Sequence, residues 1–298
     1  MEAYKNLLRE VLEDGVWQEN RTGIKTKFIP GAMIKLDLEK GFPVGFLRKT
    51  APKSAMAEMQ GFLRGYTNAA QFRELGCKFW DGNANEPIKG TNISPWLSSP
   101  FRKGIDDIGE VYGYFWRNWI GDDGTKHDQV MDVLNTIINN PYDRRMVVSG
   151  WKVEAIKQIR GALPPCHDSW TVMTDVQNKL MHLSWRQRSV DTILGTPANV
   201  VGYAFLLELL ARLTGYTPKY LIGHFDNVHI YENHMFAVEE MLERENLPLP
   251  NLVFSKEVPE YKENKLFQPE WINKINNTHL FLENYQYHPA IEGLTMAV

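Results

Sequence analysis

The stretch that most constrains the fold of this chain runs from residue 163 to residue 213. Alternating apolar and polar residues at 169–176 and 179–186 predict two antiparallel strands joined at residues 177–178. A nearly all-apolar run at 200–213 follows, and its length predicts a helix. A helix that is apolar on most sides is buried on most sides. We therefore expect a core helix directly after a strand pair.

The rest of the chain supplies further helices and a strand. Apolar residues recur at helical spacing in residues 4–12, 52–63 and 130–138, and residues 34–38 alternate as in a strand. No internal repeat, low-complexity tract or break in composition divides the chain. The expectation is one α+β domain over residues 1–298, with a mixed sheet. Its helices cover mainly one face, and the other face is available to a partner subunit.

Composition excludes several classes of protein. Hydrophobic residues at 43% and aromatic residues at 12% supply a core, which argues against disorder. A net charge of −3 provides no basic field for general nucleic-acid binding. Cys77 and Cys166 are too few for a disulfide framework or a tetrahedral zinc site. With no signal peptide and no run of about 18 apolar residues, we expect a soluble cytoplasmic protein without a metal.

Three kinds of side chain in this stretch together indicate a nucleotide site. Cys166 follows two prolines that stiffen its approach, and a thiol becomes nucleophilic as a thiolate, which a nearby arginine favours. Arg188 offers a planar fork for a phosphate, and Ser189 adds a hydroxyl donor. The amide of Asn199 can face the N–H and C=O edge of a pyrimidine. The set predicts a pyrimidine nucleoside monophosphate attacked by sulfur.

Each of these residues also has an ordinary structural interpretation. A lone cysteine is commonly a small buried hydrophobe, Arg-Ser is commonly surface, and an asparagine before a helix is commonly its N-cap. His167 adjoins Cys166 in the sequence. Neighbours on an extended chain point to opposite faces, so we do not expect a cysteine–histidine dyad.

Several motifs in order resemble the signature of the thymidylate synthase family. They are Leu-Pro-Pro-Cys-His at 163–167, Arg-Gln-Arg-Ser-Val-Asp at 186–191 and Leu-Gly-Thr-Pro-Ala-Asn-Val-Val-Gly-Tyr-Ala at 194–204. The resemblance extends to Asn-Arg-Thr-Gly at 20–23, Asp-Asn-Val-His-Ile-Tyr at 226–231 and the C-terminal Met-Ala-Val. It therefore covers nearly the whole chain, and several independent motifs are a specific signal.

The resemblance implies a reaction and catalytic roles. The reaction is reductive methylation of dUMP to dTMP, with 5,10-methylenetetrahydrofolate as co-substrate and dihydrofolate as product. Cys166 is then the nucleophile that adds to C6, and Asn199 holds the base. Glu58, at the margin of an apolar helix stripe, relays protons through water, and Tyr112 positions that water. Without the resemblance, three interpretations of Glu58 are open: it is paired, it extends from the core edge to solvent, or it is partly desolvated with a raised pKa.

The resemblance also implies binding residues and a homodimer. For dUMP these are Arg21, Arg188, Ser189, Asn199, His229 and Tyr231, with Arg144 and Arg145 donated by the other subunit. For folate they are Arg48, Lys49, Trp80, Asp191 and the terminal carboxylate of Val298. Arg48 and Lys49 stand in the reverse of the commoner order, so their separate roles stay open. No membrane and no obligate nucleic acid is implied.

Two departures from the family pattern keep alternatives open. Asn83 stands where many members have a second tryptophan, and Asn227 stands where aspartate is common. A site with one tryptophan fewer suits a hydroxymethylase, in which water captures the methylene, forming 5-hydroxymethyl-dUMP and leaving tetrahydrofolate. A third alternative is a protein that holds nucleotide or RNA without chemistry. Loss of activity in Cys166→Ala separates both enzymes from that protein.

Overall fold

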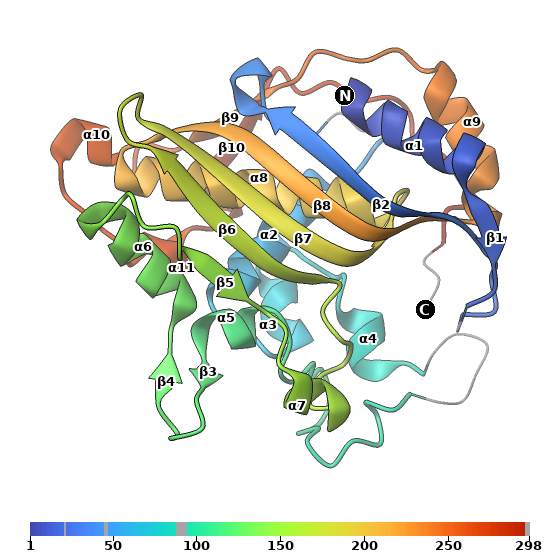
Figure 1. Cartoon of the computed structure of the whole chain (residues 1–298), viewed down its shortest axis with the longest axis horizontal. Helices are drawn as coiled ribbons and strands as arrows, with labels where there is room; N and C mark the ends of the chain where they lie inside the picture. Colours follow the sequence, from blue (N-terminus) through green and yellow to red (C-terminus); the bar gives the residue numbers. More distant parts are fainter. Residues whose placement is uncertain (21, 45–46, 88–93, 296–298) are drawn as a thin grey trace.

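The fold is built on a six-stranded sheet. The computed structural model describes residues 1–20, 22–44, 47–87 and 94–295. The strand order is β1-β2-β8-β7-β6-β5 (Figure 1). Neighbours are antiparallel except β7 and β8, which are parallel. The predicted mixed sheet and α+β class are confirmed. The bounds are β1 Val16–Gln18, β2 Thr26–Asp37, β5 Val147–Ser149, β6 His167–Asp175, β7 Leu180–Asp191 and β8 Thr217–Tyr231.

The parallel pair is joined by α8 (Gly195–Thr214). Parallel strands need a crossover, and this helix supplies it. In Figure 1, α8 and α2 (Pro52–Leu63) lie behind the sheet. Every residue at 200–214 except Glu208 and Arg212 is buried. The predicted core helix is confirmed, and it begins five residues before the apolar run, so that Asn199 is the fifth residue of the helix.

The other predicted elements are present with adjusted ends. The helix expected at 52–63 is α2, and those expected at 4–12 and 130–138 are α1 (Glu2–Asp14) and α6 (Gln129–Asn139). The strand expected at 34–38 is the end of the longer β2. The remaining helices are α3 Ala69–Glu74, α4 Asp81–Asn85, α5 Gly113–Arg117, α7 Val153–Lys157, α9 Met235–Glu243, α10 Tyr261–Asn264 and α11 Trp271–Lys274. Two small hairpins add β3 Trp119–Ile120 with β4 Lys126–His127, and β9 Asn251–Phe254 with β10 Leu280–Glu283.

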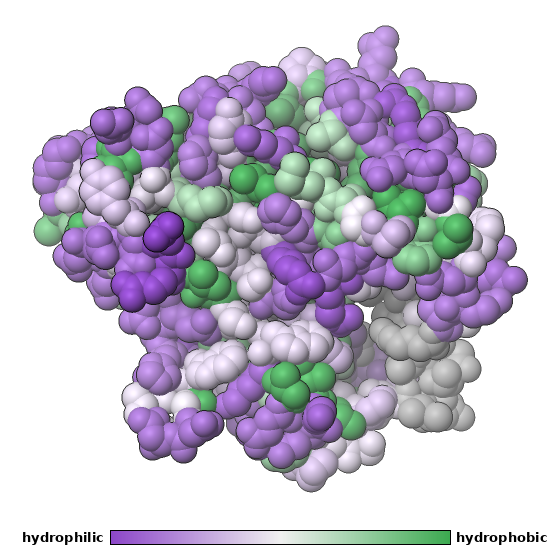
Figure 2. Space-filling model, viewed as in Figure 1, coloured by the Kyte–Doolittle hydropathy of each residue, from purple (hydrophilic) through white to green (hydrophobic). Residues whose placement is uncertain are grey.

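The face of the sheet away from α8 carries apolar side chains. Met33, Val147 and Met173 are 60%, 47% and 38% exposed, whereas Ile34, Val148 and Val172 beside them are buried. Alternate residues of a strand face opposite sides, so the first three point away from the core. Figure 2, viewed toward this face, shows hydrophobic residues interspersed with hydrophilic ones. Among the described helices, none combines the length and hydropathy needed to cross a membrane.

Candidate active site

Cys166 lies immediately before β6 and is fixed through its backbone. Its N–H donates to the Tyr112 hydroxyl at 2.8 Å, and its carbonyl accepts from the Arg188 N–H at 2.9 Å. The thiol is free, and the residue is half-buried. The sulfur is therefore held in place without being enclosed in the core, as a nucleophile requires.

Arg188 lies against the approach to Cys166. Its Nε donates to the Pro165 carbonyl at 2.8 Å and Nη2 donates to the Pro164 carbonyl at 3.1 Å. The guanidinium also lies over the Trp151 ring, with 5.5 Å to its centroid. The two prolines thus stiffen the approach to Cys166, and their carbonyls also orient the guanidinium of Arg188. Ser189 follows on β7, opposite Asn227 of β8.

His167 is part of the support for Cys166 and is not its base. Its Nδ1 is 2.7 Å from the Tyr203 hydroxyl, and its ring stacks on Tyr112 with centroids 4.1 Å apart. Burial lowers the pKa of His167 to about 3, so the ring is neutral. The expected absence of a cysteine–histidine dyad agrees with this arrangement. His167 instead fixes the ring of Tyr112, whose hydroxyl holds the backbone of Cys166.

Asn199 is oriented by a residue that sequence reasoning missed. The Gln187 amide donates to Asn199 Oδ1 at 3.0 Å and to the Ser189 carbonyl at 3.1 Å. Gln187 is 3% exposed, and a buried amide needs such partners. Strand alternation places Gln187 on the face opposite its neighbours. This alternation was the one sequence signal that could have identified Gln187 as buried. Gln187 uses one lone pair of Oδ1 and so fixes the plane of the Asn199 amide, which leaves the second lone pair of Oδ1 and the Nδ2 donors for a ligand.

Glu58 is a half-buried residue whose carboxylate is bonded by Trp80. The Trp80 indole N–H donates to Glu58 Oε1 at 3.0 Å. Burial raises the pKa of Glu58 to about 7, and the bond from Trp80 opposes that rise. Trp80 is 4% exposed and meets Phe62 and Tyr112 edge to face. The structure therefore places Trp80 in the core beside Glu58, and its predicted folate contact stays a prediction.

The loop between β7 and α8 is held by Asp191 and Arg48. Asp191 Oδ1 accepts from the Ile193 and Leu194 N–H groups at 2.8 and 3.2 Å. Arg48 Nη2 donates to the Ile193 carbonyl at 2.6 Å, and burial lowers the pKa of Arg48. Lys49 is exposed, with its ammonium 5.3 Å from the Tyr287 ring centroid. The geometry separates the two: Arg48 fixes the loop, and Lys49 faces solvent.

His229 and Tyr231 share one face of β8, as strand alternation predicts. Their ring centroids are 5.2 Å apart, nearly perpendicular at 89°. His229 Nδ1 is 2.8 Å from Asn227 Oδ1, and burial lowers the pKa of His229. Asn227, one of the departures from the family pattern, therefore orients His229.

The remaining predicted residues are two exposed arginines and two residues outside the described ranges. Arg144 and Arg145 are exposed just before the edge strand β5, and the Arg145 guanidinium pairs with Asp143 at 2.6 Å. Arg21 and Val298 lie outside the described residues. The tail can be followed to Thr295, whose carbonyl lies 2.9 Å from His234 Nε2.

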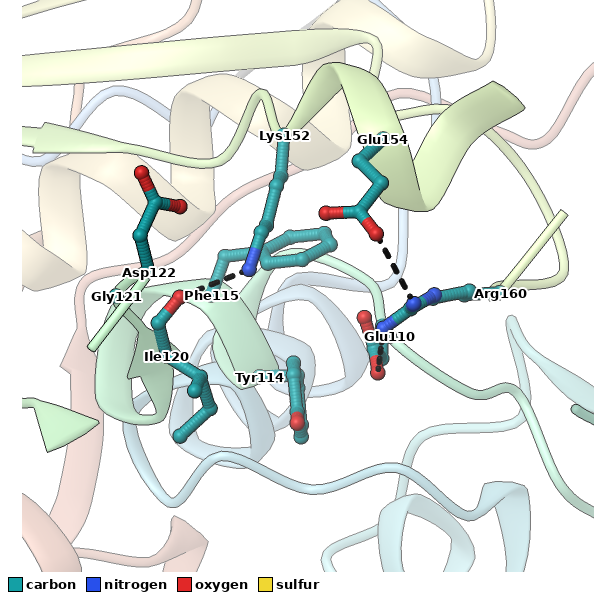
Figure 3. Close-up of a pocket in the computed structure, with 9 residues that line it drawn as sticks. All are labelled: Glu110, Tyr114, Phe115, Ile120, Gly121, Asp122, Lys152, Glu154 and Arg160. Carbon is teal, nitrogen blue, oxygen red and sulfur yellow. Dashed lines mark hydrogen bonds and ion pairs between the residues drawn. The ribbon is translucent and has the colours of Figure 1, made fainter. Parts of the chain in front are cut away.

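Two open pockets lie apart from this site. One, of about 380 Å³, is lined by nine residues that Figure 3 draws, among them Lys152 and an Arg160 paired with Glu110 and Glu154. The other, of about 550 Å³, is lined by Arg64, Tyr66, Arg117, Asn118, Lys126, Asp128 and Asn273. Neither contains a predicted site residue, so the site is identified by its converging donors. Within the described residues, no group of three or more His, Cys, Asp or Glu side chains is arranged to hold a metal.

Comparison with known proteins identifies the family. A family model described as thymidylate synthase matches residues 2–298. The chain belongs to the thymidylate synthase family. It is 42% identical to the thymidylate synthase of Pseudomonas putida over 97% of both chains. It is 38% identical to that of Bordetella bronchiseptica over 98% of both, and 35% identical to that of Mycoplasma mobile over 98% of this chain and 99% of the relative. Thymidylate synthases are methyltransferases, and nothing in these comparisons favours the hydroxymethylase alternative.

Proposed function

We propose that this chain converts dUMP to dTMP, using 5,10-methylenetetrahydrofolate and leaving dihydrofolate. The observation that carries the proposal is the position of Cys166, a half-buried free thiol whose backbone is fixed by Tyr112 and Arg188. A free thiol on a residue with a fixed backbone, next to two carbonyls that bind a guanidinium, is suited to attack on an electron-poor ring carbon. The two cysteines are both unpaired, which supports a reducing compartment, and we propose the cytoplasm.

The nucleotide is proposed to lie between β7, the start of α8 and the end of β8. Arg188 and Ser189 bind the phosphate together with Arg21. His229 and Tyr231 bind a sugar hydroxyl. Asn199, aimed by Gln187, donates to O4 of uracil and accepts from N3–H. Cytosine presents a donor at C4 and an unprotonated N3, so the same amide disfavours it.

In the proposed chemistry, the Cys166 thiolate forms a bond to C6 of uracil. The electron pair of the C5–C6 double bond moves toward C5 and O4, and C5 becomes an enolate-like nucleophile. After C5 has gained the one-carbon unit, its proton passes through water to Glu58, which must be ionised to accept it. Loss of that proton breaks the bond between the one-carbon unit and the folate, which leaves an exocyclic methylene on C5. A hydride from the folate then converts this methylene to the methyl group, the C5–C6 double bond is restored, and the sulfur leaves C6 as a thiolate. The pKa near 7 suits Glu58 to accept and return a proton at neutral pH.

The folate supplies the one-carbon unit and the hydride when bound. Asp191 suits its ring, because both backbone bonds end on Oδ1 and Oδ2 can face a ring N–H. We propose that Lys49 faces the anionic end of the folate and that Arg48 fixes the loop that Asp191 begins. Trp80 and the tail ending at Val298 are proposed to keep water from the reacting carbon.

The product folate tests the proposal against the hydroxymethylase. When the enzyme is incubated with dUMP and the folate, one dihydrofolate is expected to form for each nucleotide product. The rise in absorbance that dihydrofolate gives measures this formation. A hydroxymethylase forms product while tetrahydrofolate remains. Nucleotide product formed without dihydrofolate would therefore refute methylation, and mass spectrometry of the nucleotide distinguishes the methyl from the hydroxymethyl group.

The exposed face of the sheet supports a homodimer. Met33, Val147 and Met173 lie on it, and Arg186 of β7 pairs there with Asp168 and Asp226 and offsets part of their negative charge. A sheet face of this kind suits a second copy of the chain, in an isologous pairing. We propose that Arg144 and Arg145 then reach the phosphate bound by the other subunit.

Subunit mixing tests the donation of arginines. Cys166→Ala and the double variant Arg144→Ala, Arg145→Ala are each expected to be inactive. After unfolding and refolding together at equal amounts, they are expected to recover about a quarter of wild-type activity, because half the dimers are mixed and each has one complete site.

The matched control uses a variant of Arg188, which binds the phosphate in the same subunit as Cys166. Cys166→Ala mixed with Arg188→Ala is expected to recover no activity, since Arg188 and Cys166 belong to one site in one chain. Recovery in both mixtures, or in neither, would overturn the arrangement of Arg144 and Arg145.

A further inference from the structure

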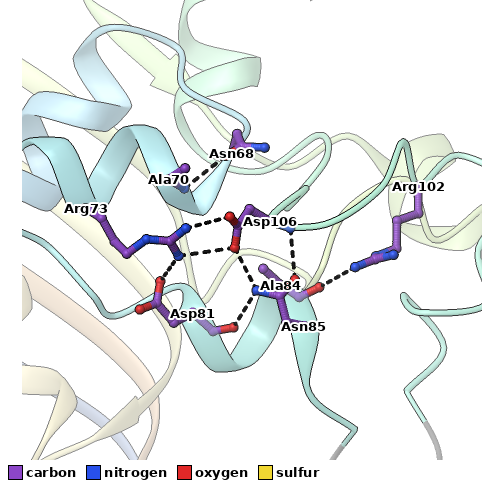
Figure 4. Close-up of polar contacts among 8 residues, drawn as sticks. All are labelled: Asn68, Ala70, Arg73, Asp81, Ala84, Asn85, Arg102 and Asp106. Atoms are coloured by element: carbon purple, nitrogen blue, oxygen red, sulfur yellow. Dashed lines mark hydrogen bonds and ion pairs between the residues drawn. The ribbon is translucent and has the colours of Figure 1, made fainter.

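A clamp of charged side chains holds the short helix α4. Arg73 of α3 donates through Nη1 to Asp81 Oδ1 at 2.7 Å and through Nη2 to Asp106 Oδ2 at 2.5 Å (Figure 4). Nη1 also reaches Asp106 Oδ1 at 3.1 Å, so the contact with Asp106 is bidentate. Bidentate guanidinium–carboxylate contacts fix geometry as well as charge. Arg73 thus ties the start of α4 to the loop that precedes α5.

Asp106 is itself fixed from three directions. Its N–H donates to Asn85 Oδ1 at 2.9 Å, and its carboxylate accepts from Asn85 Nδ2 at 2.8 Å. Its carbonyl accepts from the Ala69 N–H at 2.7 Å. Asp106 has a φ of 63°, in the left-handed region that an aspartate adopts when its surroundings hold it there. Asp106 is therefore a rigid anchor for Arg73, and α4 is held at both ends.

The clamp adjoins the donor to Glu58. Trp80, whose indole N–H bonds Glu58 at 3.0 Å, directly precedes the clamped Asp81. On the other side, Phe72 directly precedes Arg73, and its ring lies 6.0 Å from that of Trp80. Arg73 and Asp81 therefore each follow directly after one of two aromatic residues whose rings pack together. A shift of α4 moves the indole N–H away from Glu58.

From this geometry we infer that Arg73 is a positioning residue of the reaction: it clamps α4 so that the Trp80 indole stays bonded to the Glu58 carboxylate. The inference rests on the proposed role of Glu58. Ring packing holds the position of Trp80, and the indole bond to Glu58 requires a fixed direction as well. The clamp supplies that direction, and it does so without touching the substrate.

The groups around Glu58 determine the direction in which its pKa moves when the bond from Trp80 is loosened. The other titratable groups that face it are the Cys77 thiol and the hydroxyls of Tyr112 and Tyr203, and burial keeps all three neutral by raising their pKa values. Trp80 is the donor that favours the charged carboxylate. Loosening that bond raises the pKa of Glu58 further. The pH at which Glu58 becomes able to accept a proton then rises.

The test compares Arg73→Gln with the wild type. We expect kcat to fall about 3- to 10-fold, a small part of the effect of a general base, with the KM for dUMP unchanged. The acid limb of the kcat–pH profile is expected to move up by about 0.5 to 1 pH unit, the scale of one hydrogen bond. Arg73→Lys, which keeps a charge for Asp81 and Asp106, is expected to recover most of the shift. A stability loss alone leaves the profile in place.

A double-mutant cycle locates the action of Arg73 at Trp80. Trp80→Phe keeps a ring and removes the indole N–H, so it is expected to move the acid limb in the same direction. Adding Arg73→Gln to Trp80→Phe is then expected to move the limb no further. The matched control is Arg160→Gln, which also breaks a guanidinium away from two carboxylates, Glu110 and Glu154, and is expected to leave the limb unchanged.

The titration of Glu58 is also measured without turnover, by carbon-13 NMR of enzyme labelled at the glutamate side-chain carboxyl carbon. The signal of Glu58 is identified by its absence in Glu58→Gln. Arg73→Gln is expected to raise that midpoint in the substrate-free enzyme. An unchanged midpoint, or additive shifts in the cycle, would overturn the inference. A failure of the proposed function is distinguishable, because it appears as absent dTMP formation in the wild type whatever the midpoint does.

Discussion

Cys166→Ala is expected to lower the rate of dTMP formation by at least about 10⁴-fold, because the proposed addition to C6 requires its sulfur. Binding of dUMP is expected to stay within about threefold of the wild type, since the phosphate and base contacts proposed for Arg188 and Asn199 do not involve the sulfur. Turnover is followed by dihydrofolate formation, and binding by calorimetry. Weak binding together with lost activity would indicate a structural cysteine instead.

A trapped adduct assigns the sulfur directly. With 5-fluoro-dUMP and the folate, fluorine at C5 blocks proton loss, so the bond between sulfur and C6 is expected to persist and to add the mass of both molecules to the chain. Cys166→Ala is expected to show no added mass. Cys77→Ala, which removes the other thiol, is expected to retain it, because Cys77 is buried and free of that role.

Glu58→Gln is expected to lower kcat by at least about 100-fold while making the protein more stable at pH 8. The sign of the stability change follows from linkage. Glu58 has a pKa of about 7 in the folded chain, above the ordinary value of 4.5 for a glutamate, so the folded state binds the proton more tightly. Stability from this group is full below about pH 4.5 and is lost as pH rises through 7. Glutamine avoids that loss.

The expected gain for Glu58→Gln is about 2 to 3 kcal/mol at pH 8, shrinking toward zero near pH 4.5. Denaturant unfolding at the two pH values measures it. Glu208→Gln is the matched control: burial also raises the pKa of Glu208 to about 7, but it lies in the middle of α8 beside Arg212. It is expected to show a similar gain with kcat retained. Equal stability of Glu58→Gln and wild type at pH 8 would contradict a buried, neutralised carboxyl.

Local periodicity predicted the elements that depend on local sequence. The helix at 52–63 and the strand pair ahead of α8 agree with the structure because hydrophobic spacing records which face is buried. Only the end of β2 was predicted, because the full length of β2 comes from its pairing with β8 across the chain. Propensity within a window carries no information about a partner so distant.

The site was predicted in its chemistry and missed in its supports. Cys166, Arg188 and Asn199 belong to motifs that sequence reasoning recognised, and the structure brings them together through β6, β7 and α8. Gln187 was missed, since an amide in a strand shows no chemistry until its burial is known. Arg73 was missed because its partners, Asp81 and Asp106, come together only through the fold. The extent of the single domain stays a prediction.

The pairing of β2 with β8 also governs when this protein can fold during its synthesis. Thr26 pairs with Tyr231 and Asp37 with Tyr220, so these partners leave the ribosome about 200 residues apart. Until the later strand emerges, the earlier one presents an unsatisfied edge with an apolar side, a surface that invites aggregation. We therefore expect the nascent chain to expose β2 through most of its elongation, until β8 has emerged.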